Sequence, residues 1–206
     1  MGLFGRIGKG EPYDWLVVGL GNPGEKYART RHNVGEEAVR LLAERRGVTL
    51  KGGRDNALVA ETRLAGPHGD QRVVLAFPIT FMNESGQAVS GLVRRYRIET
   101  PEQIIVVQDE LDLPPGELKI KAGGGLAGHN GLRSITQHLK TQDYLRVRIG
   151  VGTPDHKNVG KGHVLSKVPK HERELLDIQI ANAADAVELI IARGVDAAMQ
   201  RYNGKP

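Results

Sequence analysis

The chain has 206 residues and a formal net charge of +5, from 29 lysines and arginines against 24 aspartates and glutamates, a balance that favours an anionic partner. It contains no cysteine, which excludes a disulfide scaffold, an iron–sulfur cluster and a thiol nucleophile. No segment has the ~18 apolar residues of a membrane span and the first residues lack a signal-peptide core, so we expect a cytoplasmic protein that binds no membrane.

Strands and helices alternate along the chain. Residues 1–13 are predicted to form a flexible extension, and residues 14–206 a single catalytic domain. Short apolar runs predict strands at 15–19, 58–64, 73–77, 104–108, 118–121 and 145–151. Helical periodicity predicts helices at 36–46, 85–96, 132–139 and about 170–200, the first with Asn33 and Glu36 at the spacing of a capping box. The alternation indicates an α/β domain with a mainly parallel sheet between helices.

The first predicted strand runs into a glycine-rich loop, Gly19-Leu20-Gly21-Asn22-Pro23-Gly24, which matches the GxGxxG pattern of dinucleotide-binding proteins. That pattern requires a helix to open directly from the glycines, so that its N-terminus meets the pyrophosphate. Here Asn-Pro-Gly predicts a turn, and the next ten residues lack apolar periodicity. The context therefore disfavours an oxidoreductase, which would have to bind NAD or NADP.

His32 lies at the end of that loop, just before the next predicted helix. A helix N-terminus favours neutral imidazole, the form that a general base needs, although many loop histidines only form local hydrogen bonds. Asp109 follows the apolar run 104–108, at the strand end where open α/β sheets bind ligands. A carboxylate there could hold an imidazole in one tautomer. Glu110 and Asp112 are near enough in sequence to serve equally, and each could be a simple turn carboxylate.

Three asparagines lie beside glycines or turns, Asn22 in GNPG, Asn83 in FMNESG and Asn130 in GHNG. An amide both donates and accepts, so it can hold a peptide group or a developing oxyanion; asparagine is also a common turn residue. The chain lacks the GxSxG nucleophile motif, the GxxxxGK[ST] phosphate loop and metal-binding histidine spacings. What remains for a hydrolase is a water activated by histidine.

Two predicted strands alternate basic and apolar residues, with Lys119 and Lys121 in one and Arg146 and Arg148 in the other. Because side chains alternate between the two faces of a strand, each pair lies on one face. If the two strands are neighbours, the four cations form a patch beside the glycine-rich loop 122–131, which suits a phosphate backbone. The alternative is an ordinary solvated strand face.

Together these segments resemble the bacterial-type peptidyl-tRNA hydrolase family. The resemblance is carried by VVGLGNPGEKYARTRHNVG (17–35), PITFMNESG (78–86), QDELDLPPGELKIKAGGGLAGHNGLRSI (108–135) and RVRIGVG (146–152), in the family's order and spacing. It implies a single α/β domain with a mixed, twisted sheet flanked by helices, which acts as a monomer and needs no metal or other cofactor. It also implies the activity, hydrolysis of the ester between a peptide and the 3′-terminal ribose of tRNA, which frees the tRNA for reuse.

The resemblance further implies roles for individual residues. His32, in TRHN, matches the base that activates water, and Asp109, in QDELDLPPG, matches the carboxylate that supports it. Asn22 matches the residue that distinguishes N-blocked from free aminoacyl-tRNA. Other positions match contacts to the peptide or to the acceptor stem and 3′ end of tRNA: Tyr27, Phe81, Met82, Asn83, His129 and Asn130. A last group matches cations that grip tRNA phosphate, namely Lys121 and Arg148 with Lys119 and Arg146 as auxiliaries.

Three positions depart from the family pattern: Glu84 where an apolar or basic residue is usual, Gln108 in place of histidine or an aromatic residue, and Thr153 in place of a basic one. We expect them to affect tRNA affinity or the pH optimum and to leave the catalytic residues intact. The alternative to the enzyme is a non-catalytic RNA-binding relative of the same fold, of the splicing-factor type in chloroplasts. The short segment before the first strand is unlike a transit peptide, which favours the enzyme.

Overall fold

The computed structural model describes residues 3–4, 11–153 and 160–204, so most of the predicted extension 1–13 lies outside the described residues. Tyr13, the last residue of that extension, is anchored to the domain. Its main-chain N–H donates to the carbonyl of Tyr96 at 3.0 Å, and its ring meets the ring of Tyr96 edge-on.

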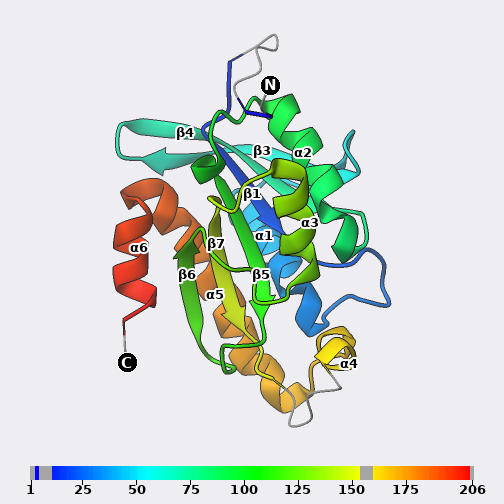
Figure 1. Cartoon of the computed structure of the whole chain (residues 1–206). Helices are drawn as coiled ribbons and strands as arrows, with labels where there is room; N and C mark the ends of the chain where they lie inside the picture. Colours follow the sequence, from blue (N-terminus) through cyan, green and yellow to red (C-terminus); the bar gives the residue numbers. More distant parts are fainter. Residues whose placement is uncertain (1–2, 5–10, 154–159, 205–206) are drawn as a thin grey trace.

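The described residues form a seven-stranded sheet in the order β2-β3-β4-β1-β5-β7-β6 (Figure 1). The central strands are mutually parallel: β4 (Gly69–Pro78), β1 (Trp15–Gly19), β5 (Ile104–Glu110) and β7 (Leu145–Gly150). Both edges are antiparallel, where β3 (Ala57–Gly66) joins β4 to the short β2 (Lys51–Gly52), and β6 (Leu118–Ala122) pairs with β7. The predicted single α/β domain with a mixed sheet is confirmed.

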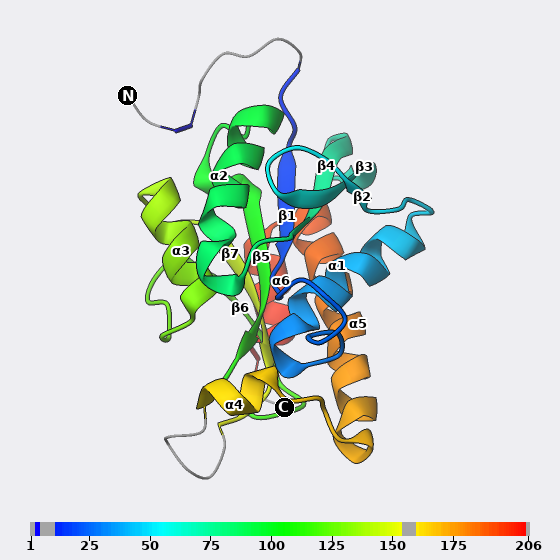
Figure 2. The same ribbon diagram turned by 90° about the vertical axis from the view of Figure 1, so that its right-hand side faces the viewer.

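Helices cover both faces of this sheet (Figure 2). On one face α1 (Val34–Arg45), α5 (Lys170–Arg193) and α6 (Val195–Tyr202) bury Leu42, Ile180 and Ala198 in a common core with Val17 and Val107. On the other face α2 (Ser85–Tyr96) and α3 (Asn130–Leu139) bury Leu92 and Ile135 with Val18 and Val106. Because β1 and β5 are covered on both faces, their sequences read as continuous apolar runs.

The predicted strands and helices are present, with boundaries that differ by a few residues. The chain enters α1 through a 3-10 turn, η1 (Arg31–Asn33), and Asn33 makes no side-chain cap bond to the α1 backbone, contrary to the predicted capping box. The predicted helix at 170–200 is divided into α5 and α6 at Gly194, whose φ of +87° suits glycine. Four elements were not predicted from the sequence: β2, α4 (Gly160–Leu165) and the 3-10 turns η2 (Met82–Glu84) and η3 (Pro101–Gln103). Among the described helices, none is long and apolar enough to cross a bilayer.

Candidate active site

A cleft of about 1170 Å³ opens at the carboxyl ends of the parallel strands β1 and β5, the usual ligand-binding edge of such a sheet. Its walls come from the loop after β1, η2, the end of β5, the glycine-rich loop before α3, and α4. It brings together residues predicted from distant parts of the sequence: Asn22, Tyr27, His32, Phe81, Met82, Asn83, Asp109, His129 and Asn130. Residues without a predicted role complete the wall, among them Arg133, Val164 and Leu165.

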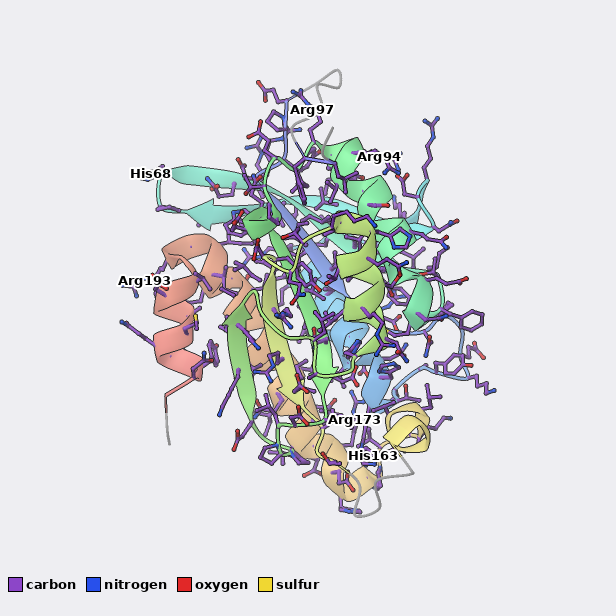
Figure 3. The ribbon with its side chains drawn as sticks, in the orientation of Figure 1. His68, Arg94, Arg97, His163, Arg173 and Arg193 are labelled. Atoms are coloured by element: carbon purple, nitrogen blue, oxygen red, sulfur yellow. The ribbon has the colours of Figure 1, made fainter. Side chains whose placement is uncertain are left out.

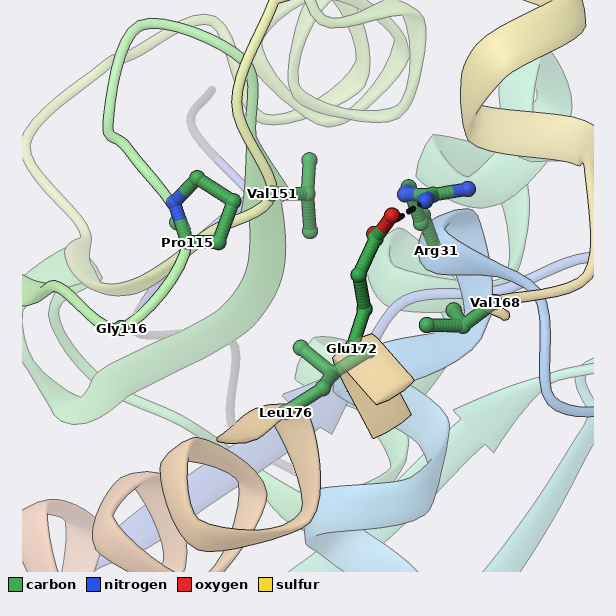
Figure 4. A pocket seen from close by; sticks show the side chains of 8 residues that line it. Arg31, Pro115, Gly116, Val151, Val168, Glu172 and Leu176 are labelled. Carbon is green, nitrogen blue, oxygen red and sulfur yellow. Dashed lines mark hydrogen bonds and ion pairs between the residues drawn. The ribbon is translucent and has the colours of Figure 1, made fainter. Parts of the chain in front are cut away.

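His32 lies in η1 between two anchored residues, Arg31 before it and Asn33 after it. Before it, Arg31 is buried and donates to Ser166 Oγ at 2.9 Å and to a carboxylate oxygen of Glu172 at 2.5 Å. Figure 4 shows this Arg31–Glu172 ion pair in a small pocket, with Val168 and Leu176 beside it. Arg31 therefore faces α5, whereas His32 faces the cleft with 12% of its side chain exposed.

Asp109, at the end of β5, accepts two hydrogen bonds at one oxygen. Its Oδ1 lies 2.8 Å from His32 Nδ1 and 3.0 Å from His129 Nε2, and its side chain is 2% exposed. Burial alone would raise the pKa of Asp109, but the electrostatic attraction of the two rings and the hydrogen bonds that they donate outweigh burial and hold this pKa well below its usual range. The ionised carboxylate keeps the His32 proton on Nδ1, which leaves Nε2 as the basic nitrogen. Of the three carboxylates left open by the sequence, Asp109 is the partner of His32.

His129 caps the N-terminus of α3. Its Nδ1 accepts from the main-chain N–H groups of Gly131 at 3.1 Å and Leu132 at 3.4 Å, so its proton resides on Nε2 and is donated to Asp109. The donor atoms of His32, Asp109 and His129 lie within 4.8 Å of one another, as metal ligands would. A metal at His129 Nε2 would move that proton to Nδ1 and break both bonds to α3. The donor set therefore fits a hydrogen-bond network better than a metal site.

Asn22 is held in the turn after β1 by the buried Asn33. Asn33 Oδ1 accepts from the Asn22 main-chain N–H at 3.0 Å, and Asn33 Nδ2 donates to the Asn22 carbonyl at 2.9 Å. Asn22 Oδ1 accepts the main-chain N–H of Met82 at 2.8 Å. Asn22 Nδ2 has no partner among the described residues, so it is left to donate to a ligand in the cleft. The sequence predicted Asn33 only as a helix cap and missed this supporting role.

The other predicted cleft residues differ in exposure. Phe81 is 55% exposed, while Met82 next to it is buried. Asn130, the first residue of α3, accepts from Arg133 Nη1 at 3.4 Å. Asn130 and Arg133 stand one turn apart on the same helix face, a spacing from which Arg133 could have been found in the sequence. Asn83 in η2 is exposed.

The basic residues lie on β6 and β7, and these two strands are neighbours in the sheet, which is the condition for a common patch. Lys119 stands opposite Arg148 and Lys121 opposite Arg146 in the register. Arg148 Nε donates to the buried Glu110 at 3.0 Å. Burial, with repulsion from Arg146 and Arg148, lowers the pKa of Lys121 from its usual value. Lys119, Lys121 and Arg148 stay partly exposed on one face, and we call these three residues the basic patch.

Arg146 differs from its expected role as a contact to tRNA. It is 2% exposed, and its guanidinium donates to the successive carbonyls of Gly123, Gly124 and Gly125, the last at 2.8 Å. A guanidinium engaged by three main-chain carbonyls beneath a loop does not reach a phosphate outside it. Alternation along β7 could not separate Arg146 from Arg148, because both project from the same face and only one lies under the loop.

The three departures from the family pattern lie outside the lining of the cleft. Glu84 is exposed in η2, Gln108 is buried within β5, and the Thr153 hydroxyl donates to the carbonyl of Leu111 at 2.8 Å. Their positions leave the contacts of His32 and Asp109 unchanged. Gln108 is nonetheless unusual, because both polar atoms of its buried amide lack a partner among the described residues.

The geometry supports hydrolysis by an activated water. His32 has its proton fixed on the side of Asp109, and its basic nitrogen has no partner among the described residues, which is the state of a general base. Asn22 offers a fixed amide donor nearby in the same cleft, where an oxyanion could form. The basic patch adjoins the glycine-rich loop, where Lys121 lies against Gly124, and is suited to an anionic substrate longer than the cleft itself.

Comparisons with known proteins agree with this chemistry. A family model described as peptidyl-tRNA hydrolase matches residues 16–206. The peptidyl-tRNA hydrolase of Frankia casuarinae is 50% identical over 189 residues, which cover 92% of this chain and 93% of that protein. That of Chloroflexus aggregans is 45% identical over 189 residues, with 92% and 98% covered. The crystal structure of peptidyl-tRNA hydrolase from Acinetobacter baumannii aligns with a TM-score of 0.84 at 41% identity, over 95% of this chain and 98% of its own.

Proposed function

The chain belongs to the peptidyl-tRNA hydrolase family and hydrolyses peptidyl-tRNA, and from that premise we propose that His32 is the base that activates the attacking water. The observation that carries the proposal is the 2.8 Å hydrogen bond between His32 Nδ1 and Asp109 Oδ1 inside the cleft. The non-catalytic RNA-binding alternative finds no support in the comparisons, since the relatives named above are hydrolases.

The reaction begins when His32 Nε2 takes a proton from water and the oxygen attacks the ester carbonyl. Asp109 stabilises the imidazolium that forms, because its ionised Oδ1 already accepts the Nδ1 proton. The tetrahedral intermediate then breaks its bond to the ribose oxygen of the tRNA. That oxygen leaves with the proton returned from His32, and the peptide is released as a carboxylic acid.

Asn22 is the donor that we assign to the substrate carbonyl. Its Oδ1 is fixed by the Met82 N–H, so the orientation of its amide is set before substrate binds. A preset donor of this kind contributes typically about 3–4 kcal/mol to transition-state stabilisation. Asn83 and Asn130, with Tyr27, Phe81 and Met82, line the cleft around it and are assigned to the peptide and the 3′ end of the tRNA.

The basic patch is assigned to phosphates of the tRNA acceptor stem. Lys121 lies against Gly124 of the glycine-rich loop, and the same loop ends at His129 in the cleft. An acceptor stem on the patch would therefore have its 3′ end near the catalytic residues. Arg146 is left out of this assignment because it is buried beneath the loop.

Replacing Lys121 or Arg148 with alanine is expected to raise KM about tenfold, the usual worth of a hydrogen bond to a charged group, with little change in kcat. Each variant should also reduce the slope of log KM against log salt by about one phosphate contact. Steady-state kinetics over a range of KCl concentrations measures both effects. Arg193→Ala, an equal loss of charge at the exposed end of α5 (Figure 3), is the control and should match the parent. A parent KM that does not respond to salt would remove the phosphate assignment.

The activity is tested with N-acetylaminoacyl-tRNA and free aminoacyl-tRNA as paired substrates. We expect the blocked substrate to be cleaved and the free one to be poor, since recognition of a peptide group disfavours a charged α-amine. Adding EDTA to both reactions tests the absence of a metal requirement. With a radioactive label in the amino acid, hydrolysis is measured as label that becomes soluble in acid when it is freed from the tRNA. Loss of activity in EDTA would contradict the proposed mechanism.

We propose that the protein acts as a monomer in the cytoplasm. The cleft and the basic patch are both built from one chain, so no second copy is needed to complete the site. Its substrate contains tRNA, which supports a site of action where translation occurs.

A further inference from the structure

His129 uses both ring nitrogens, and each has a different partner. Nδ1 accepts from two main-chain N–H groups at the start of α3, those of Gly131 at 3.1 Å and Leu132 at 3.4 Å. Nε2 donates to Asp109 Oδ1 at 3.0 Å. The side chain is 8% exposed, so little of it is available to a substrate.

The position of the His129 proton follows from these contacts. A ring nitrogen that accepts hydrogen bonds carries no proton, so the proton resides on Nε2. Protonating Nδ1 would break both bonds to α3 and would place a positive charge at the positive end of a helix. His129 is therefore held as a neutral donor by the fold around it, and it is unsuited to act as the base.

The donated proton goes to the same oxygen that His32 uses. His32 Nδ1 lies 2.8 Å from Asp109 Oδ1, and the two rings are tilted by 44° with their centroids 5.2 Å apart. Asp109 Oδ1 thus has one partner whose charge changes during the reaction, His32, and one whose charge is fixed, His129.

We propose that His129 is a positioning residue, which holds Asp109 Oδ1 in line with His32 and shares the charge of that oxygen. The role rests on the proposed function, in which His32 is the base. With His129 in place, Asp109 Oδ1 is oriented toward His32. Because this oxygen also accepts a hydrogen bond from His129, it attracts the protonated ring of His32 less strongly than it would without that bond. His32 then releases its proton to the leaving ribose oxygen more readily.

The other charged groups around this network have partners of their own. Arg31 is paired with Glu172, Glu110 with Arg148, and Arg133 with Asn130, while the α4 residues at the cleft, Val164 and Leu165, are apolar. Tyr27 also faces the cleft, with Lys26 over its ring, and His163 of α4 contacts the carbonyl of Val151. Removing the N–H of His129 is therefore the way to change how the charge of Asp109 Oδ1 is divided between its two partners, His32 and His129.

The decisive variant is His129→Asn. Asparagine is a good N-cap, so its side-chain oxygen can replace Nδ1 at the start of α3, but it is too short to reach Asp109. We expect a Tm within about 2 °C of the parent, a KM within about twofold, and a kcat lowered about tenfold by the loss of alignment. The acid limb of kcat/KM should move to higher pH, because the charge of Asp109 then acts on His32 alone.

Two further variants separate the possible roles. His129→Ala loses the cap as well, and its Tm should fall by a further 2–4 °C or so. His68→Asn, in the exposed turn between β3 and β4 (Figure 3), is the control for the substitution itself and should match the parent. Ring ¹⁵N spectra of the parent should show the neutral His129 ring as the Nε2–H tautomer.

Three outcomes would overturn the proposal. If His129→Asn matches the parent in kcat and acid limb, His129 serves only as a cap. If KM rises tenfold with kcat and pH profile unchanged, it contacts substrate. If the spectra show a proton on Nδ1, the network is wrong even in a fully active enzyme. A parent that fails to cleave N-acetylaminoacyl-tRNA overturns the proposed function itself, and this failure is distinguishable because it precedes any comparison of variants.

Discussion

The His32→Ala variant is expected to lose about 10²- to 10⁴-fold in kcat, the usual contribution of a general base, while it still binds tRNA and folds. The side chain is partly exposed to the cleft, and within the described part of the chain its one hydrogen bond is to Asp109, so little packing is lost. The basic patch is separate from it and should hold tRNA as before. Single-turnover hydrolysis of N-acetylaminoacyl-tRNA gives the rate, and filter binding of deacylated tRNA gives the affinity.

The control for this variant is His68→Ala, which removes an imidazole from the exposed β3–β4 turn. Figure 3 shows His68 at the opposite end of the molecule from His163, which precedes the cleft residues of α4. His68→Ala should retain the parent rate. A His32→Ala protein that cleaves at the parent rate would remove His32 from the mechanism, and one that unfolds or loses tRNA would make it structural.

The Asp109→Asn variant is expected to lose a comparable factor, about 10²- to 10⁴-fold in kcat, with tRNA affinity unchanged. An asparagine oxygen can still accept from His32, but it carries no charge to stabilise the imidazolium. Its amide group can also rotate and donate to the rings, which favours the wrong tautomer of His32. Asp112→Asn, an exposed carboxylate three positions along, is the matched control and should keep the parent rate.

Asp109 also has a predictable effect on acid stability. Its pKa in the folded protein lies below the ordinary value of 3.8, so the ionised carboxylate stabilises the fold above about pH 4. That contribution is lost as the pH falls toward the lowered pKa, and Asp109→Asn should lack this part of the acid-side dependence. Urea unfolding between pH 5 and 2.5 measures it. Equal pH dependence in the two proteins would mean that the two histidines do not favour the ionised carboxylate.

The central strands and the main helices could be predicted from local pattern alone. Runs such as residues 104–108 are apolar throughout because β5 is covered on both faces, and that signal needs no knowledge of its neighbours. The start of α1 could not be predicted in this way. Asn33 has the spacing of a cap, yet its side chain is drawn to the backbone of Asn22, eleven positions earlier.

A site residue could be predicted from the sequence where its residue type and position allow few roles. It could not be predicted where contacts with distant parts of the chain determine its role. His32 and Asp109 were found as candidates, but only the fold brings them together across 77 positions. Arg146 and Arg148 are equivalent in the sequence pattern. The glycine-rich loop 122–131 covers Arg146, which binds the carbonyls of that loop, and leaves Arg148 partly exposed. The anchoring of Arg31 by Glu172, 141 positions away, leaves no signal in the local sequence.

Arg146 has a thermodynamic consequence for the wall of the cleft. Glycine loses more conformational entropy on ordering than any other residue, and the segment that leads to His129 contains three glycines in succession. The hydrogen bonds from one buried guanidinium to their carbonyls order this segment when the chain folds. The conformational entropy of this segment is therefore lost when the chain folds and not when tRNA binds. Contacts between tRNA and this wall then contribute their full free energy to affinity, because none of it is needed to order the loop.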